Sequence, residues 1–310
     1  MMKKFTFLIA ALAMSTGWLK AQNFTDGLMM QKKDLCTGFL YTQDQWKHYW
    51  EGSLNRVNGN VGTVSTKSVA WMGTYGVTDK VNIIAMVPYV WTHASQGVLH
   101  DMTGMQDLTI GVKYNFFKKS AGPGEIKAIG VGSYAVPMSN YTPDFMPLSI
   151  GNAAQKLSAR FTLNYKLTSG WYANATSSYM WRSNVKLDRP AYYTDDVFTI
   201  SDEVALPNVM DLSGSFGYLK HGLNAFVSYS QQWTLGGGDI RRQDMPFVSN
   251  RMNFTKIDLT AQYFLPKINN LAVRAMIGTT VAGRNVGQST YFLGGLLYTF
   301  HFAKPVATTN

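Results

Sequence analysis

The stretch DLTIGVKYNFF, residues 107–117, alternates large apolar side chains with polar or small ones. Successive side chains of an extended strand point to opposite faces, so one face of this stretch is apolar and the other is polar. The apolar face comprises Leu108, Ile110, Val112, Tyr114 and Phe116. The stretch therefore predicts a β-strand that lies between an apolar environment and a polar one.

The same alternation recurs in RFTLNYKL (160–167), KIDLTAQYFL (256–265) and the closing stretch GLLYTFHF (295–302). Helical periodicity is scarce, and beyond the N-terminal apolar run no stretch reaches the roughly 18 apolar residues that a membrane-spanning helix needs. The chain is therefore expected to be all-β. The pattern predicts about twelve strands, near residues 35–44, 62–77, 81–93, 106–117, 126–138, 156–168, 171–186, 207–220, 223–235, 252–265, 271–283 and 290–302.

The connections between these strands alternate in length. Those after even-numbered strands are short, such as TSG (168–170) and HG (221–222), and the predicted connection KKSAGPGE (118–125) belongs to this set. Those after odd-numbered strands are mostly long, such as YTPDFMPLSIGNAA (141–154). Transmembrane β-barrels have short periplasmic turns, long extracellular loops and an even number of strands. The sequence therefore predicts a transmembrane antiparallel up-and-down β-barrel, placed in the outer membrane of a Gram-negative-type bacterium.

Aromatic residues support this prediction. Trp171 and Trp181 share one face of a predicted strand, and ten residues at roughly 3.3 Å each, tilted by roughly 40–45°, rise about 24 Å, close to the apolar band of an outer-membrane barrel. Aromatic girdles line both edges of that band. The predicted girdle residues are Trp171, Trp181, Trp233, Tyr298, Phe300 and Phe302. The aromatic closing strand also resembles the signal that the barrel-assembly machinery recognises, although AKPVATTN follows Phe302.

The N-terminus has the layout of a secretory signal peptide. Lys3 and Lys4 precede a short apolar run, and small residues with a cut after Ala21 follow it. We expect residues 1–21 to be the signal peptide and residues 22–310 to form a single transmembrane β-barrel domain with a short N-terminal segment and a short C-terminal tail. Cys36 is the sole cysteine, so an internal disulfide is excluded, and we interpret Cys36 as a small wall residue.

The polar faces of the predicted strands carry more bases than acids. If these faces point inward, the lumen holds the bases Lys113, Lys127, Arg160, Lys166, Arg182, Lys186, Lys256 and Arg274 and the acids Asp107, Asp211 and Asp258. Positive charge in a narrow pore with low-dielectric walls concentrates anions, so the sequence predicts anion preference. The alternative is that the bases pair with acids, with loop carboxylates or with lipopolysaccharide phosphates at the rim.

Two neighbouring stretches carry a family signature. YGVTDKVNIIAMVPYVW (Tyr75–Trp91) has a Gly-x-Thr-Asp turn and a strand that reaches Pro-Tyr, and GMQDLTIGVKYNFF (Gly104–Phe117) has Gly-x-x-Asp-Leu-x-x-Gly-x-Lys-Tyr. They resemble the hairpin of the outer-membrane transporters catalogued under the MetA pathway of phenol degradation. That family is regarded as distantly similar to long-chain fatty-acid channels, and the resemblance implies a transport role.

Three local expectations follow. Fatty-acid channels plug their lumen with an N-terminal hatch, but here only Gln22–Asp34 precedes the first strand, which is too short for a comparable plug. Thr78 and Asp79 are expected to form a tight turn through hydrogen bonds to nearby backbone. Pro88 donates no ladder hydrogen bond and is expected to mark a bulge or kink.

Catalysis, metals and cofactors lack sequence support. None of the five histidines has metal-ligand spacing to another His or to Cys, and no nucleophile motif is present, so we expect no enzyme, no metal and no cofactor. The loop 192–203 is interpreted as solvated, with cation or sugar binding as the alternative. The loop 236–244 is flexible and basic, and whether it folds into the barrel as a constriction is left open.

The sequence therefore predicts an outer-membrane channel for passive uptake or efflux of small solutes, with small organic anions or aromatic and amphiphilic compounds as candidates. The alternative is a plugged barrel that anchors or partners extracellular or periplasmic proteins. Barrels near eight strands fill with side chains and those of 16–18 hold water, so twelve strands leave both readings open. Expected partners are outer-membrane lipids, lipopolysaccharide, the barrel-assembly machinery and a small-molecule solute; nucleic acid is not expected.

Overall fold

The structure is a computed structural model that describes residues 24–241, 245–266, 268 and 270–302. The predicted signal peptide (1–21) and the tail 303–310 lie outside the described residues. Besides one short strand, the main sheet consists of twelve long strands. They are β1 (Asp34–Trp46), β4 (Val64–Gly76), β5 (Val81–Ala94), β7 (Asp107–Ala121), β8 (Gly124–Pro137), β9 (Lys156–Leu167), β10 (Trp171–Arg182), β15 (Val209–Lys220), β16 (Leu223–Thr234), β17 (Asn253–Phe264), β18 (Leu271–Arg284) and β19 (Thr290–His301).

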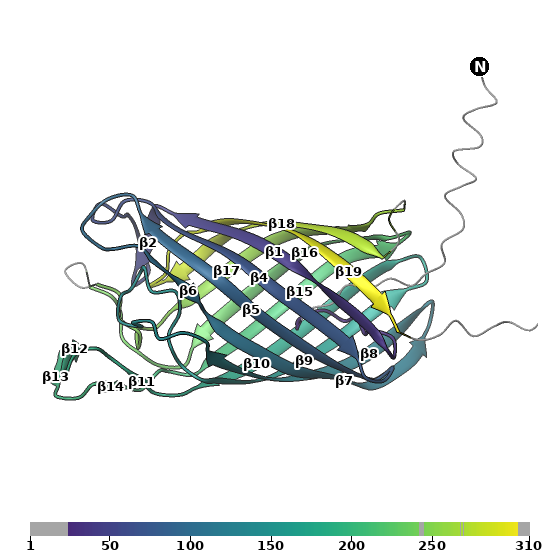
Figure 1. The fold of residues 1–310 in the computed structure, drawn as a ribbon, viewed down its shortest axis with the longest axis horizontal. Coiled ribbons are helices and arrows are strands. Elements are labelled where there is room, and N and C mark those ends of the chain that lie inside the picture. Colours follow the sequence, from purple (N-terminus) through teal and green to yellow (C-terminus); the bar gives the residue numbers. More distant parts are fainter. Residues whose placement is uncertain (1–23, 242–244, 267, 269, 303–310) are drawn as a thin grey trace, which may run out of the picture.

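Each long strand pairs antiparallel with its neighbours in the chain, and β1 pairs with β19 from Asp34↔His301 to Gln45↔Thr290. This last pairing closes the sheet into the barrel of Figure 1. The predicted all-β, twelve-stranded antiparallel barrel is therefore confirmed. Within the described part of the chain, no helix is long and apolar enough to cross a bilayer.

Short strands lie within the long connections between the wall strands. They are β2 (His48–Glu51), β3 (Leu54–Val57), β6 (Met102–Met105), β11 (Val185–Lys186), β12 (Tyr192–Thr194), β13 (Val197–Thr199) and β14 (Glu203–Val204). The strands β11 to β14 lie at the left-hand end of the barrel in Figure 1. We call that end extracellular and the end with the short turns periplasmic, as in other transmembrane barrels.

The turn between β7 and β8 is shorter than predicted. Residues 118–121 continue β7 and pair with β8, so the connection is only 122–123. A register shift between Asn115 and Phe117 breaks the period-2 pattern at this point, and both Phe116 and Phe117 are exposed. The sequence pattern therefore ended before the strand did.

Apolar and polar side chains are distributed over the two faces of the sheet in the reverse of the arrangement found in a soluble protein. Large apolar side chains such as Leu163, Leu259 and Ile277 are exposed on the outer face, whereas polar residues such as Thr162 and Thr260 are buried on the inner face. Exposed apolar surface of this extent requires an apolar solvent, which the bilayer supplies. The alternation read from the sequence is thus an alternation between lipid and lumen.

The ladder between β5 and its neighbour is irregular at Pro88. Pairing steps from Met86↔Thr109 to Tyr89↔Met105, so the β6–β7 side has one residue more than β5. The backbone N–H of Gln106 donates to the carbonyl of Pro88 at 2.9 Å across this step. The predicted bulge is confirmed, as is the turn at Thr78, whose side chain accepts hydrogen bonds from the N–H groups of residues 80 and 81.

The two faces of β16 are expected to differ in their tolerance of charge. We expect Val227→Arg to impair assembly, because arginine near the bilayer midplane of a barrel's lipid face costs about 2–4 kcal/mol. Ser230→Arg, three residues along the same strand but on the lumen face, is expected to assemble. The measurement is the amount of protein in the outer membrane that migrates faster unheated than boiled. Equal behaviour of the two variants would contradict the assignment of faces.

Candidate functional site

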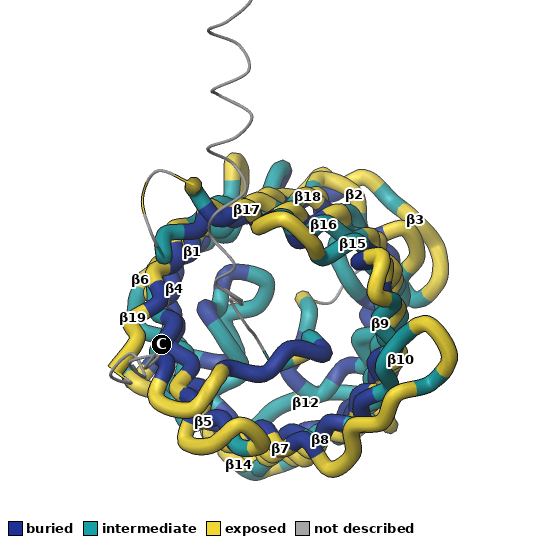
Figure 2. The backbone as a smooth tube through the Cα atoms, turned by 90° about the vertical axis from the view of Figure 1, so that its right-hand side faces the viewer, coloured by how far each residue is buried: buried dark blue, intermediate teal, exposed yellow. Residues whose placement is uncertain are grey.

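The N-terminal segment, residues 24–33, enters the barrel at the periplasmic end. Leu28, Met29 and Met30 are buried, and Figure 2 shows buried chain crossing the inside of the ring of strands. The N–H of Met30 donates to Oδ1 of Asn82 on β5 at 2.9 Å, and Nδ2 of Asn82 donates to the carbonyl of Met30 at 3.3 Å. The segment therefore lies against the inner wall, a placement that the sequence did not predict. That it is too short for a plug comparable to the hatch of a fatty-acid channel stays a prediction.

Charged side chains hold the segment from two strands. Lys113 on β7 has no exposed side-chain surface, and its Nζ donates to both the backbone carbonyl and Oδ1 of Asp26 at 2.7 Å. Arg160 on β9 donates from Nη1 to the carbonyl of Phe24 at 3.3 Å. Arg274 on β18 is also buried and lies within electrostatic range of Asp26. A buried ammonium group is costly unless paired, so Asp26 is the counter-charge that this part of the lumen needs.

An apolar cluster holds the other end of the segment. Met30 packs in the periplasmic cluster, which also comprises Cys36, Leu40, Met72, Phe264, Ala272 and Leu297 of the inner wall. The segment also requires close backbone approach, since a Cβ added to Gly76 would stand 1.9 Å from the carbonyl oxygen of Gln31. The periplasmic seal therefore combines a charge contact, an apolar contact and a steric fit.

The extracellular end is covered by the loop 138–155 between β8 and β9. Leu148 is fully buried, and the hydroxyl of Thr92 on the inner face of β5 donates to its carbonyl at 2.6 Å. Nε2 of Gln106 donates to the carbonyl of Ile150, which packs against Val90. This loop therefore folds inward over β5 and narrows the barrel mouth.

Tyr141 fastens the loop to the wall. Its hydroxyl donates to Oδ1 of Asp107 on β7 at 2.9 Å and accepts from the N–H of Ala153 at 3.0 Å. Nζ of Lys156 binds the other oxygen of Asp107 at 2.6 Å. Burial, and then the neighbouring Asp107 carboxylate, raise the pKa of the Tyr141 phenol far above its usual range. The phenol therefore stays protonated and remains a donor at any physiological pH.

Two further loops join this cover. The loops 138–155, 183–208 and 235–252 share an apolar cluster of Ala154, Val185, Leu187, Val204, Leu206, Phe247 and Val248. In the loop 235–252, Ile240 is buried and its N–H donates to Oδ1 of Asn285 at 3.0 Å. The extracellular seal is thus a packed layer made from three connections.

The predicted charged residues lie on inward-facing positions of the wall strands. They are Lys113, Arg160, Lys166, Arg182, Lys256, Arg274, Asp211 and Asp258. The register places Ser178 directly between Arg160 and Asp211, and its hydroxyl donates to Asp211 Oδ2 at 2.8 Å. Nζ of Lys256 lies 4.6 and 5.0 Å from the centroids of Phe254 and Tyr291. The role of these residues in selecting solutes remains a prediction.

The sequence overestimated the positive excess of the lumen. Lys186 was assigned inside, but β10 ends at Arg182 and Lys186 lies exposed on β11 in an extracellular loop. Four acids were missed, namely Asp26 of the N-terminal segment, Asp34 and Asp44 of β1, and Glu125 of β8, which pairs with Lys127 at 3.0 Å. The pattern of β1 contains the signal for Asp34 and Asp44, because both share the phase of the buried Cys36.

The predicted girdle residues lie on the outer face. Trp171 and Trp181 are exposed at opposite ends of β10, and Trp171 stacks on Phe216 with ring centroids 5.2 Å apart. Tyr298, Phe300 and Phe302 are exposed at the periplasmic end, whereas Trp233 is half-buried near the extracellular end of β16. Their membrane role remains a prediction.

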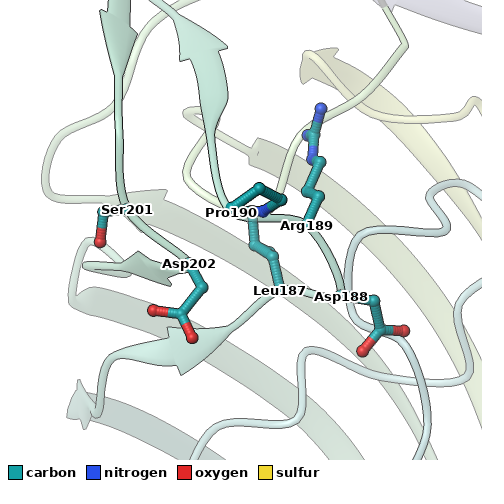
Figure 3. A pocket seen from close by; sticks show the side chains of 6 residues that line it. All are labelled: Leu187, Asp188, Arg189, Pro190, Ser201 and Asp202. Atoms are coloured by element: carbon teal, nitrogen blue, oxygen red, sulfur yellow. The ribbon is translucent and has the colours of Figure 1, made fainter.

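A hollow of about 520 Å³ lies in the loop 183–208, outside the barrel wall, and is shown in Figure 3. Asp188 and Asp202 point to one side of it, whereas Arg189 points away and pairs with Asp144 at 2.7 Å. Nearby, Tyr193 and Phe198 of the hairpin β12–β13 are exposed. The hollow belongs to the loop surface and is not part of a path through the lumen.

Comparisons with known proteins agree with this geometry. The model of the family described as "Putative MetA-pathway of phenol degradation" matches residues 55–293 and confirms the resemblance carried by Tyr75–Trp91 and Gly104–Phe117. Among curated proteins, no sequence matches the chain significantly.

Three solved structures are similar to this chain. An outer membrane channel from Pseudomonas putida F1 matches with a TM-score of 0.71 at 14% identity, over 91% of this chain and 100% of that chain. The NanC porin matches with a TM-score of 0.46 at 9% identity, over 84% and 98%. The translocator domain of the autotransporter NalP from Neisseria meningitidis has the same TM-score and identity, over 89% and 90%.

The extracellular seal is expected to depend on the Tyr141 hydroxyl. Tyr141→Phe removes the donor to Asp107 and leaves the carboxylate with one partner fewer in a buried site, so the loop 138–155 should loosen. We expect faster proteolysis within this loop and an unchanged heat-modifiable barrel. Tyr229→Phe is the control, because that phenol lies exposed on the outer face of β16, away from this loop. Identical proteolysis of both variants would show that Tyr141 does not hold the loop.

Proposed function

The chain belongs to the family described as MetA-pathway of phenol degradation, and we propose that it is a passive outer-membrane channel for small solutes. The observation that carries the proposal is that both seals are made by segments outside the strand ladder, residues 24–33 and the extracellular loops. Such segments can move without breaking the hydrogen bonds that close the barrel. A barrel built only for anchorage needs no charged inner wall behind such seals.

Small organic anions and amphiphiles fit the inner wall best. Arg160, Lys256 and Arg274 supply fixed positive charge, although the acids found in the lumen offset part of it. The wall of the periplasmic cluster is apolar, with Leu40 and Met72 on adjacent strands. An inner wall that is cationic in one part and apolar in another suits a solute that carries a negative charge and an apolar group. This function requires no cofactor and no catalytic residue.

The outer wall fits the expected lipid partners. Lys67 of β4 is exposed and stands directly across from Trp91 of β5 near the extracellular end. A lysine beside an interfacial tryptophan lies where lipid headgroups begin, so Lys67 would contact lipopolysaccharide phosphate. Recognition of the closing strand by the barrel-assembly machinery remains part of this proposal.

The second candidate is a plugged barrel that binds other proteins. The observation in its favour is the exposed hairpin β12–β13, where Phe198 and the following Ile200 face solvent at the extracellular end. This function requires the lumen to stay closed. Conductance of the purified protein in a planar bilayer therefore separates the two candidates.

The intact protein is expected to conduct, and deletion of residues 24–31 should raise its conductance because the periplasmic seal is then absent. Heat-modifiability of the deletion variant on a gel controls for folding. A deletion variant that remains folded and carries no current would contradict the channel and favour the plugged barrel.

The open channel is expected to prefer anions. The reversal potential across a salt gradient measures this preference, which should weaken with salt because the Debye length falls from about 10 Å at 0.1 M to about 3 Å at 1 M. Joint replacement of Lys166 and Lys256 by Gln should reduce it, since both lie on the inner wall. Lys67→Gln on the outer face is the matched control. Cation preference of the intact protein would exclude an anion route.

A further inference from the structure

The N-terminal segment offers the lumen one carboxylate and, four residues later, one large apolar side chain. Asp26 binds Lys113, and Met30 enters the periplasmic cluster. Four extended residues span at most about 14 Å, so both groups meet the wall within the length of a small amphiphile. The segment thus presents the same two groups, one carboxylate and one apolar group, as an amphiphilic monocarboxylate.

The wall around Asp26 is strongly cationic. Lys113 has Arg160, Lys127 and Asp26 as charged neighbours. Arg274, on β18 far along the chain from Lys113, is a further charged neighbour of Asp26. Lys113 has no exposed side-chain surface, and Arg274 is only 8% exposed. Departure of Asp26 would leave these buried cations without the carboxylate that neutralises them, which is costly unless another anion takes its place.

The apolar part of the site belongs to the wall itself. Leu40, Met72 and Leu297 project inward from three adjacent strands, and Met30 is the member of the cluster that the N-terminal segment contributes. When Met30 leaves, the three wall residues face the lumen and can receive another apolar group of similar size. Methionine walls adapt readily to differently shaped apolar groups.

We propose that Lys113 and Arg274 form a carboxylate subsite, and the periplasmic cluster an adjoining apolar subsite, for an amphiphilic monocarboxylate, and that Asp26 and Met30 occupy this site as an intramolecular stand-in. The proposal rests on the proposed channel function, because it names the solute class that the channel carries. Solute and segment compete for the same groups, so solute binding releases the periplasmic seal.

Cys36 provides a reporter that does not depend on conductance. It is the sole cysteine of the chain, is only 2% exposed and packs with Met30 in the periplasmic cluster. Release of the segment would open Cys36 to a small water-soluble thiol reagent in the lumen. The measured quantity is the labelling rate of the purified full-length protein in detergent.

Hexanoate is the probe, and hexanol is the control with the same chain length and no charge. We expect hexanoate to accelerate Cys36 labelling and hexanol to leave it unchanged. Asp26→Asn weakens the internal competitor, so the hexanoate concentration for half-maximal acceleration should fall by at least about tenfold, as expected for loss of a hydrogen bond to a charged group. Equal effects of hexanoate and hexanol would overturn the carboxylate subsite.

Substitutions of the wall residues test the same site without changing the N-terminal segment. Lys113→Met and Arg274→Gln should each abolish the hexanoate response, whereas Lys118→Met should keep it, because Lys118 is exposed at the end of β7. Heat-modifiability identifies any variant that fails to fold, and the two wall variants are independent. A folded Lys113→Met or Arg274→Gln protein with an unchanged response would overturn the proposal. Hexanoate-dependent labelling in a protein that never conducts would support the subsite and reject only the channel function.

Discussion

The pairing of β1 with β19 is the interaction on which the rest of the structure depends. Hydrocarbon offers no partner for a backbone N–H or carbonyl, so a sheet can cross a bilayer only when its two edge strands satisfy each other. Here the first and last strands pair along nearly their whole length, from Asp34↔His301 onward. Closure then divides the side chains of every strand between lipid and lumen, which is the origin of the period-2 pattern.

Closure also creates an inner space that the wall side chains do not fill alone. Polar groups that are buried inside it must find partners within the chain. Lys113 finds Asp26, and Asp107 finds both Lys156 and Tyr141. The Lys113–Asp26 pair joins a wall strand to the N-terminal segment. Asp107 joins its strand to the loop 138–155 through Tyr141, and to the strand that follows this loop through Lys156. The charges of the lumen therefore position the segments that form the seals.

The sequence predicted the wall well because its determinants are local. Alternation, turn residues and the spacing of Trp171 and Trp181 are properties of neighbouring residues, so strand positions followed from them directly. The seals depend on contacts between distant residues, such as Arg160 with Phe24, which are 136 positions apart. No local pattern marks residues 24–33 as an insertion into the barrel. Lys186 was misplaced for a related reason, since the alternation of β10 gives no sign of its end at Arg182.

The two seals differ in the forces that hold them. The extracellular seal rests on a neutral phenol, the ion pairs Lys156–Asp107 and Arg189–Asp144, and an apolar layer shared by three loops. The periplasmic seal rests on a carboxylate among buried cations and on one methionine. Under the proposed competition, an anion would replace that carboxylate, because the wall groups that hold it recognise charge rather than the segment itself. Under the same proposal, a charged solute would act on the periplasmic seal, and passage through the outer mouth would rely on motion of the extracellular loops.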